Sequence, residues 1–237
     1  KKVEALAGQR VVAVSAGEHH SLALAADGSL WSWGWGGLGQ LGHGDTQDQL
    51  LPKKIEALAG QRVVAVSAGL YHSLALTTDG AVWSWGHGAF GRLGHGDRQT
   101  QLLPKKIEAL AGQRVVAVSA GDDHSLALTA DGAVWSWGQG ACGKLGHGDL
   151  QQRLLPKKVE ALAGQRAVAV SAAHNHSLAL TADGAVWSWG GGGGGRLGHG
   201  DTQRQLLPKK LEAFAGRRVV AVSAGGEHSL ALTADGA

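Results

Sequence analysis

The sequence predicts an all-β protein, a β-propeller built from four-stranded antiparallel blades. The first observation is a unit of 52 residues that recurs along the 237-residue chain. The second is that every unit contains short apolar segments separated by glycine-containing turns. Repeats of this length are typical of arrays in which each unit packs on its neighbours. We interpret the chain as one repeat array, which divides into 1–52, 53–104, 105–156, 157–208 and a partial repeat, 209–237.

The first two segments of each unit read as strands. In the second repeat, Val63 to Ala68 is apolar on both faces, which predicts a fully buried strand. His72 to Thr77 alternates, so that Leu74 and Leu76 share one face while small residues occupy the other. Asp79-Gly80 follows, and this dipeptide predicts a tight hairpin turn because Gly tolerates positive φ.

The third segment, Val82 to Trp85, places two Trp on one face, and a Gly-rich connection follows at 86–96. The fourth strand is expected around Lys54 to Leu58, after Pro52, because Pro and Lys suit an outer edge. Glu-Ala-Leu-Ala also suits a helix, but the stretch is too short for a stable one. A sheet with one bulky and one small face cannot bury itself. Stacking bulky onto small faces around a ring predicts the propeller.

Three motifs occur in the same order in each repeat: Ala-Gly-x-x-His-Ser-Leu-Ala-Leu, Asp-Gly-x-Val-Trp-Ser-Trp-Gly and Gly-x-Leu-Gly-His-Gly-Asp. This pattern resembles the repeat of the regulator of chromosome condensation (RCC1-type) family over essentially the whole chain. The resemblance implies a ring that usually has about seven blades. Members act as guanine-nucleotide exchange factors, ubiquitin-ligase modules, light sensors or inhibitors, so the fold does not determine the function.

Two departures from the family pattern argue against two of the functions found in the family. Exchange activity in the family depends on a wedge-like insertion, whereas the equal periods here leave no insertion. The repeats are also similar to those of the plant UV-B photoreceptor, in which Gly-Trp-Arg-His-Thr precedes the second strand. The matching stretches here, for example 69–73, contain no Trp. This absence argues against UV-B sensing by that mechanism.

Composition and recurring motifs argue against several classes of protein. A net charge of +3 indicates neither a nucleic-acid nor a membrane partner, and no apolar run is long enough to span a bilayer. The single Cys142 excludes an intramolecular disulfide and leaves the compartment open. Gly34-x-Gly36-x-x-Gly39 matches a dinucleotide fingerprint, but Leu-Gly-His-Gly-Asp after it cannot sustain the helix that such a site needs. We therefore expect no nucleotide cofactor.

Histidine, serine and aspartate positions recur in every repeat. The histidines at the start of the second strand would lie tens of degrees apart around a ring, which favours structural hydrogen bonding over a shared metal ion. A catalytic site built five times would be unusual. We therefore expect no metal, no cofactor and no enzymatic activity. These histidines are His20, His72, His124, His176 and His228.

Two connections in each repeat vary, while the other two hardly change. The variable ones join the first to the second strand and the third to the fourth, and both lie on the same face of an up-and-down blade. A scaffold with varied loops on one face is the expected form of a recognition surface, with drift in unconstrained loops as the alternative. The predicted partner-binding residues are Glu18, His19, Trp35, Leu38, Leu70, Tyr71, His87, Phe90, Arg92, Asp122, Asp123, Gln139, Lys144, His174, Asn175 and Arg196.

A protein partner is the leading hypothesis, with its contacts centred on Trp35, Tyr71, His87 and Phe90. Basic residues on the variable loops make that face mildly basic. Association with chromatin or nucleic acid, as an exchange-like regulator, is therefore a second hypothesis. A secreted enzyme inhibitor and a repeat-amplified or designed propeller without a selected ligand are further alternatives.

Ring closure raises a separate question. The two ends of the chain are in the same phase of the repeat, so the last blade stays half complete. We expect the chain to be part of a longer ring. An open arc and self-association through exposed blade edges are the alternatives.

Overall fold

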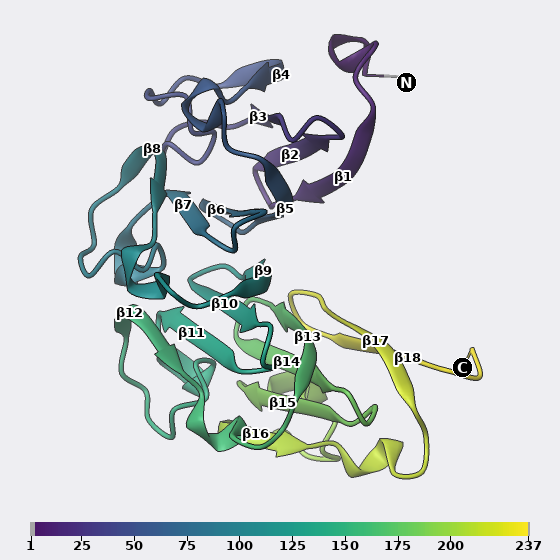
Figure 1. The fold of residues 1–237 in the computed structure, drawn as a ribbon. Coiled ribbons are helices and arrows are strands. Elements are labelled where there is room, and N and C mark those ends of the chain that lie inside the picture. The colour runs from purple at the N-terminus through teal and green to yellow at the C-terminus, as the bar shows by residue number, and fades with distance from the viewer. Residues whose placement is uncertain (1–2, 237) are drawn as a thin grey trace.

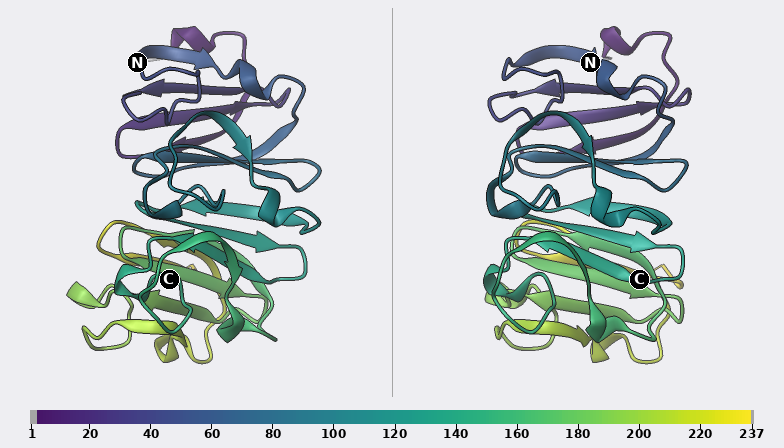
Figure 2. Two further views of the ribbon diagram at one scale, coloured as in Figure 1. Left: turned by 90° about the vertical axis from the view of Figure 1, so that its left-hand side faces the viewer. Right: turned by 60° about the vertical axis from the view of Figure 1, so that its left-hand side comes forward.

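The computed structural model describes residues 3–236 and confirms the all-β class. Four antiparallel sheets of four strands and one of two strands follow each other along an open arc (Figure 1). In each sheet the strands lie side by side in chain order. The first strands of successive sheets contact one another, so they form the inner edge of the arc. Two turned views show the same succession of blades (Figure 2).

The strands have the following bounds. The first strands are β1 (Val11–Ala16), β5 (Val63–Ala68), β9 (Val115–Ala120), β13 (Ala167–Ala172) and β17 (Val219–Ala224). The second strands are β2 (His20–Ala25), β6 (His72–Thr77), β10 (His124–Thr129), β14 (His176–Thr181) and β18 (Ser229–Thr233). The third strands are β3 (Leu30–Gly34), β7 (Val82–Gly86), β11 (Val134–Gly138) and β15 (Val186–Gly190). The fourth strands are β4 (Gln49–Lys54), β8 (Gln101–Lys106), β12 (Arg153–Lys158) and β16 (Gln205–Lys210).

Short 3-10 helices occupy two of the connections. Those that follow a fourth strand or precede β1 are η1 (Glu4–Leu6), η2 (Glu56–Leu58), η4 (Glu108–Leu110), η6 (Glu160–Leu162) and η8 (Glu212–Phe214). Those between a third and a fourth strand are η3 (Ala89–Gly91), η5 (Ala141–Gly143) and η7 (Gly193–Gly195). Among residues 3–236, none of the helices is long and apolar enough to cross a membrane.

The predicted hairpin between the second and third strands is present in the complete blades. In the second blade, Thr77 N donates to Ala81 O at 3.0 Å, and Gly80 N donates to Thr77 O at 2.9 Å. Gly80 has a φ of +82°, a conformation that costs Gly little and other residues more. The turn fixes the register in which Ser73 pairs with Trp85.

The fourth strand was predicted too late in the sequence. It ends at Lys54, and Glu56–Leu58 forms a 3-10 turn instead of continuing it. Ile55 and Leu58 are three residues apart, a spacing that a 3-10 turn brings onto one side. Both side chains are buried in the core with Leu22 and Leu24 of the same blade. Their burial outweighs the extended conformation that Pro52 and the lysines favour.

The first strand is less buried than its apolar sequence predicted. In β5, Val63 is buried, but Val64 is 46% exposed. The reason is position, because the first strands form the inner edge of the arc and contact the next blade with only part of their surface. Continuous apolar sequence therefore did not mean burial on both faces.

Trp stacking joins successive blades, as the bulky-face prediction required. Trp85 of β7 is fully buried and packs on Leu22, Leu24 and Leu30 of the preceding blade. Its indole Nε1 donates to Gln40 O at 2.9 Å, also in the preceding blade. Three of the inter-blade cores thus combine a large buried ring with a satisfied polar N–H. The other two instances are Trp137 to Arg92 O at 2.8 Å and Trp189 to Lys144 O at 2.9 Å.

The two ends of the arc lack a neighbouring blade. Val14 of β1 is 73% exposed, and Leu230 of β18 is 61% exposed, whereas Leu74 at the position equivalent to Leu230 is fully buried. Within residues 3–236 the outer edge of β18 pairs with no strand. The structure therefore has the form of an open arc, one of the arrangements expected from the matching phase of the two ends.

Candidate interaction surface

The two variable connections of each repeat come together on one face, as strand direction predicted. Arg92, which follows η3, contacts Asp122 and Asp123 on the β9–β10 connection of the next blade. Lys144, which follows η5, contacts His174 and Asn175 of the blade after that in the same way. We call the surface formed by these connections the variable face.

Each connection between a first and a second strand contains two variable residues, which we call the variable pair. The first residue of each pair lies around the axis of the arc. Together with the strand ends beside them, these residues line a hollow of about 280 Å³. The second residue of each pair is not among the residues that line this hollow. His19, Asp123 and Asn175, for example, contact residues of the connections between third and fourth strands. The residues at the hollow are Glu18, Leu70, Asp122, His174 and Gly226.

An aromatic cluster spans the variable face of the first two blades. The His19 ring lies 5.5 Å from the Trp35 ring and stacks on Tyr71 at 5.7 Å, measured between centroids. Tyr71 also meets Trp35 and His87 edge-to-face, each at 6.1 Å. Edge-to-face contacts at these distances are favourable for aromatic rings. Four residues that sequence comparison selected separately therefore form one surface.

Phe90 joins this cluster through Arg92. The guanidinium carbon of Arg92 lies 5.8 Å from the ring centroids of both Tyr71 and Phe90. Phe90 has a φ of +60°, in the left-handed region that non-glycine residues adopt only at a cost. Trp35 and Phe90 are each 38% exposed, so the ends of the cluster are open to solvent. We use the name aromatic cluster for His19, Trp35, Tyr71, His87 and Phe90.

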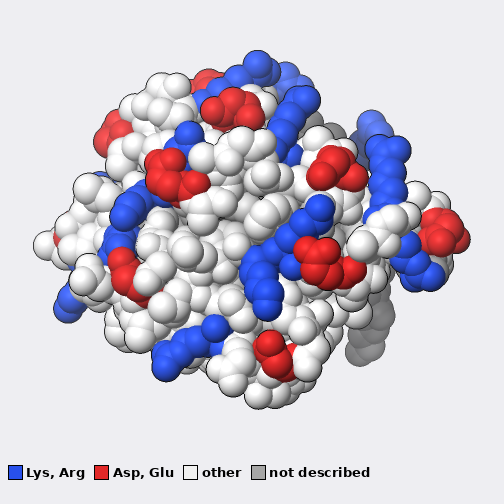
Figure 3. Space-filling view, turned by 90° about the horizontal axis from the view of Figure 1, so that it is seen from below, with Lys and Arg blue, Asp and Glu red and all other residues white. Residues whose placement is uncertain are grey.

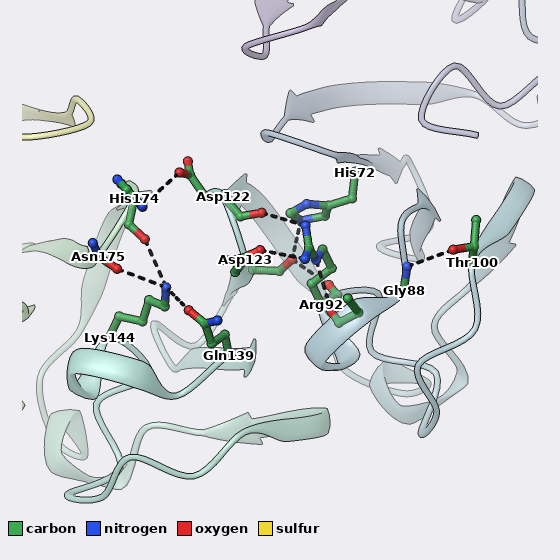
Figure 4. A network of polar contacts seen from close by, with 12 residues as sticks. His72, Gly88, Arg92, Thr100, Asp122, Asp123, Gln139, Lys144, His174 and Asn175 are labelled. Carbon is green, nitrogen blue, oxygen red and sulfur yellow. Dashed lines mark hydrogen bonds and ion pairs between the residues drawn. The ribbon is translucent and has the colours of Figure 1, made fainter. Parts of the chain in front are cut away.

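Arg92 and Lys144 were predicted to contact a partner, but the structure buries both side chains. Figure 4 shows the polar contacts that they make. Arg92 Nη2 lies 2.6 Å from Asp123 Oδ1, and Nη1 donates to Asp122 O at 3.1 Å. Lys144 Nζ donates to Gln139 Oε1 at 2.7 Å, to the His174 carbonyl at 3.1 Å and to Asn175 Oδ1 at 3.4 Å. These contacts tie each blade to the next.

Arg196 repeats this arrangement one blade later. Its Nη2 pairs with Glu227, and its Nε donates to Gly193 O at 2.7 Å. The neutral Gln40 occupies the same position in the first blade, where its Oε1 accepts from Leu38 N at 3.0 Å. The side chains at position 40 and at its equivalents 92, 144 and 196 therefore make contacts within the protein. Leu38, another predicted partner-binding residue, is half-buried next to Gln40.

Two of the basic residues on the variable loops, Arg92 and Lys144, are therefore buried, whereas Arg98 and Arg204 are exposed. Burial lowers the pKa of Arg92, and the charge of Asp123 opposes that shift. Burial likewise lowers the pKa of Lys144. Arg153 pairs with Asp149 at 2.5 Å. On the side of the molecule that is seen from below in Figure 1, acidic and basic side chains are interspersed (Figure 3).

His174 lies between two carboxylates beside the hollow. Its Nε2 is 3.6 Å from Asp122 Oδ2, and its Nδ1 is 3.6 Å from Glu227 Oε1. Burial raises the pKa of Asp122, and the charges of Asp123 and Glu18 raise it further, while His174 and Lys144 act in the opposite direction. This part of the face is polar and carries both charges, unlike the aromatic cluster.

Four of the five recurring histidines make structural hydrogen bonds, as predicted, and the fifth, His228, is exposed. His72 Nε2 lies 2.8 Å from Ser125 Oγ of the next blade, and His20, His124 and His176 make the same contact. The Gly-His-Gly-Asp histidines bond within their own blade, for example His95 Nε2 to Ser84 Oγ at 2.9 Å. Among residues 3–236, no group of three or more His, Cys, Asp or Glu side chains could hold a metal ion.

A family model described as "RCC1-like domain" matches residues 1–237. The chain belongs to this family. The resemblance seen in the repeats is thereby confirmed, and so is the propeller architecture of its blades.

Relatives within the family differ widely in size. The chain is 40% identical over 236 residues to the ultraviolet-B receptor UVR8 of Arabidopsis thaliana, covering 99% of this chain and 54% of the receptor. It is 44% identical over 241 residues to the human E3 ubiquitin-protein ligase HERC2, covering 98% of this chain and 5% of the ligase. The chain thus spans about half of one relative and a small part of the other.

Solved structures show the same arrangement of blades. Human WBSCR16 aligns with a TM-score of 0.86 at 27% identity, over 95% of this chain and 58% of that protein. Prp20p of Saccharomyces cerevisiae aligns with a TM-score of 0.84 at 26% identity, over 94% and 56%. The Prp20p structure was described together with its binding properties to Gsp1p and histones.

Proposed function

We propose that the chain is a non-enzymatic interaction module that binds a protein partner through the variable face. The observation that carries this proposal is the aromatic cluster, which ends in the exposed rings of Trp35 and Phe90. Large aromatic side chains dominate the binding energy of many protein interfaces. Prp20p, which has the same fold, binds proteins, and this supports a protein as the class of partner.

The strain at Phe90 gives further support. A φ of +60° is costly for Phe. The equivalent residue of the fourth repeat is Gly194, which adopts a similar φ at little cost. A bulky ring held in an unfavourable backbone conformation at an exposed site favours a role in recognition. The non-enzymatic part of the proposal rests on the recurring Ser and His side chains, which bond to each other between blades.

The nucleic-acid hypothesis lacks a comparable observation. Two of its basic residues on the variable face, Arg92 and Lys144, are buried between blades, which leaves Arg98 and Arg204 as exposed ones. Electrostatic binding to phosphates needs lysine and arginine side chains that are free to release counterions. The aromatic cluster therefore makes a protein partner the better-supported hypothesis.

Affinity capture with three forms of the chain tests the proposal. The wild type is compared with the variant Trp35→Ala, Tyr71→Ala, His87→Ala and Phe90→Ala, which removes most of the aromatic cluster. A control with Gln61, Gln113 and Gln165 changed to Ala alters exposed side chains on the opposite face. We expect proteins retained by the wild type and the control to be lost from the quadruple variant.

The affinity of each recovered partner is then measured with the purified variants. The quadruple variant lacks the two exposed rings, Trp35 and Phe90, and should bind at least about 100-fold more weakly. Equal affinity for the quadruple variant and the wild type would exclude the aromatic cluster as the binding site. Binding that falls steeply as salt is raised, and that survives the four substitutions, would favour the nucleic-acid hypothesis instead.

A further inference from the structure

The junction between the first and second blades is built differently from the junctions further along the arc. At the later junctions, Arg92, Lys144 and Arg196 extend from one blade to the next. The equivalent residue at the first junction is Gln40, which is neutral and fully buried. Its amide Nε2 has no hydrogen-bond partner among the described residues. This position therefore supplies no positive charge to the first junction.

Aromatic rings surround the same junction. Tyr71 lies where the later junctions have a carboxylate or an amide that faces the cation. The rings of His19 and Trp35 lie 5.7 and 6.1 Å from the Tyr71 ring, measured between centroids. Because the face of an aromatic ring attracts cations, this junction offers a cation a different kind of contact from the others. The residues equivalent to Tyr71 are Asp123, Asn175 and Glu227.

Arg92 shows how a guanidinium fits such a surface. Its guanidinium carbon lies 5.8 Å from the ring centroids of both Tyr71 and Phe90. At the same time, Arg92 Nη2 lies 2.6 Å from Asp123 Oδ1. A planar guanidinium can thus lie near aromatic rings and pair with a carboxylate in one arrangement.

Two carboxylates without a basic partner lie next to the aromatic cluster. Glu18 precedes His19, whose ring is 5.5 Å from the Trp35 ring. Asp48 Oδ1 accepts from Gly36 N, the residue after Trp35, at 2.9 Å. Both carboxylates are exposed, and neither forms an ion pair within residues 3–236. An exposed aromatic ring beside unpaired negative charge is complementary to a basic group.

We propose that the protein partner presents an arginine side chain to the aromatic cluster. In the complex, its guanidinium lies on the exposed ring of Trp35 and pairs with a carboxylate, Glu18 or Asp48. Arginine suits this site better than lysine, because a planar guanidinium stacks on a ring and can donate two N–H groups to one carboxylate. This inference rests on the proposed function, since it names the chemistry of the partner at that same site.

Selection from a random peptide library displayed on phage tests the proposal. The wild type is the target, and the variant Trp35→Ala, Tyr71→Ala, His87→Ala and Phe90→Ala is used for counter-selection. We expect arginine to be enriched above its frequency in the library. A selected peptide is then synthesised with arginine or with citrulline, which has nearly the same shape and no charge. Citrulline should weaken binding about 10-fold or more.

Two double variants of the chain locate the negative charge. Glu18→Gln with Asp48→Asn should weaken binding of the arginine peptide about 10-fold and leave binding of the citrulline peptide unchanged. An amide at position 48 keeps an acceptor for Gly36 N. The matched control, Glu212→Gln with Asp201→Asn, removes the same two kinds of acid at exposed positions of the fourth repeat and of the last partial repeat. It should bind both peptides like the wild type, and urea unfolding checks that each variant keeps the fold.

The failure of this inference can be told apart from the failure of the proposed function. Selected peptides that lack arginine, that contain lysine in its place or that bind equally well with citrulline would overturn the inference. Their loss from the quadruple variant would still support the proposed function. Self-association of the wild type that Trp35→Ala abolishes, measured by light scattering, would assign the cluster to a second copy of the chain instead. No enrichment on the wild type over the quadruple variant would count against both.

Discussion

At the scale of single residues, the histidines between blades couple stability to pH. Burial lowers the pKa of His20 and His176 to about 4, and lowers the pKa of His72 and His124 well below 6.5. The unfolded chain binds these protons near the ordinary pKa of about 6.5. Between about pH 6.5 and 4 the unfolded state therefore holds more protons, and stability falls as pH falls. Above this range the histidines are neutral in both states and contribute no pH dependence.

His124→Gln should make this pH dependence shallower. Each buried histidine contributes up to about 1.4 kcal/mol per pH unit within the window, and Gln does not titrate. Urea unfolding measured at several values from about pH 4 to 7 gives the slope. Ser177→Ala is the control, because it removes the hydrogen bond to His124 but keeps the titrating ring. An unchanged slope in His124→Gln would show that this ring takes up its proton without unfolding.

The inter-blade ion pair of Arg92 is expected to stabilise the fold more than that of Arg196. The Arg92 side chain is 2% exposed and its partner Asp123 is 22% exposed, whereas Glu227 is 64% exposed. Asp123→Asn leaves a buried guanidinium without its counter-charge and should cost about 2 kcal/mol. Glu227→Gln should cost less than about 1 kcal/mol, because exposed pairs are screened. Equal losses in denaturant unfolding would contradict this assignment.

The sequence contains a signal for these inter-blade contacts, which comparison of single positions did not detect. Arg92 meets Asp123, Lys144 meets Asn175, and Arg196 meets Glu227, so position 92 and its equivalents change together with the second residue of the next variable pair. Selecting variable residues one at a time classed Arg92, Asp123, Lys144, Asn175 and Arg196 as partner contacts. Pairing each third connection with the first connection of the next blade would have separated structural ties from the aromatic cluster.

At the scale of elements, the strands and hairpins were predictable because local chemistry determines them. Alternating Leu in β6 and the turn at Gly80 leave little choice of register. Segment 54–58 was not predictable in the same way, because Pro52 and the lysines favour extension while Ile55 and Leu58 gain burial only if the chain turns. Exposure of Val64 depends on its place at the inner edge of the arc, which no local pattern records.

The η5 turn contains a residue that glycine should improve. Cys142 has a φ of +62°, and Gly194 holds the same position in the fourth repeat. Cys142→Gly removes the left-handed strain and should raise the free energy of unfolding by about 0.5 to 1 kcal/mol. Ala141→Gly is the matched control, since Ala141 has a helical backbone and should lose stability. A loss in Cys142→Gly as large as in the control would mean that the turn stores no strain.

At the scale of the whole molecule, each blade is stabilised by the blades beside it. Trp137 and Trp33 occupy the same position in the repeat, but only Trp137 packs on a preceding blade. Trp137 is fully buried, whereas Trp33 at the end of the arc is half-buried. In a one-dimensional array, stability is approximately a sum of terms for each repeat and each interface, so the same substitution should differ with position.

Trp137→Ala should therefore cost about 3 to 5 kcal/mol, the usual loss for a buried Trp, while Trp33→Ala should cost less than about 1 kcal/mol. Urea unfolding of both variants compares them under one condition. The two substitutions remove the same side chain from the same strand position, so the difference between them measures the packing that a preceding blade supplies. Equal losses would mean that another surface covers Trp33 in solution. The first candidate would be a second copy of the chain, and the oligomeric state of wild type and Trp33→Ala would then differ.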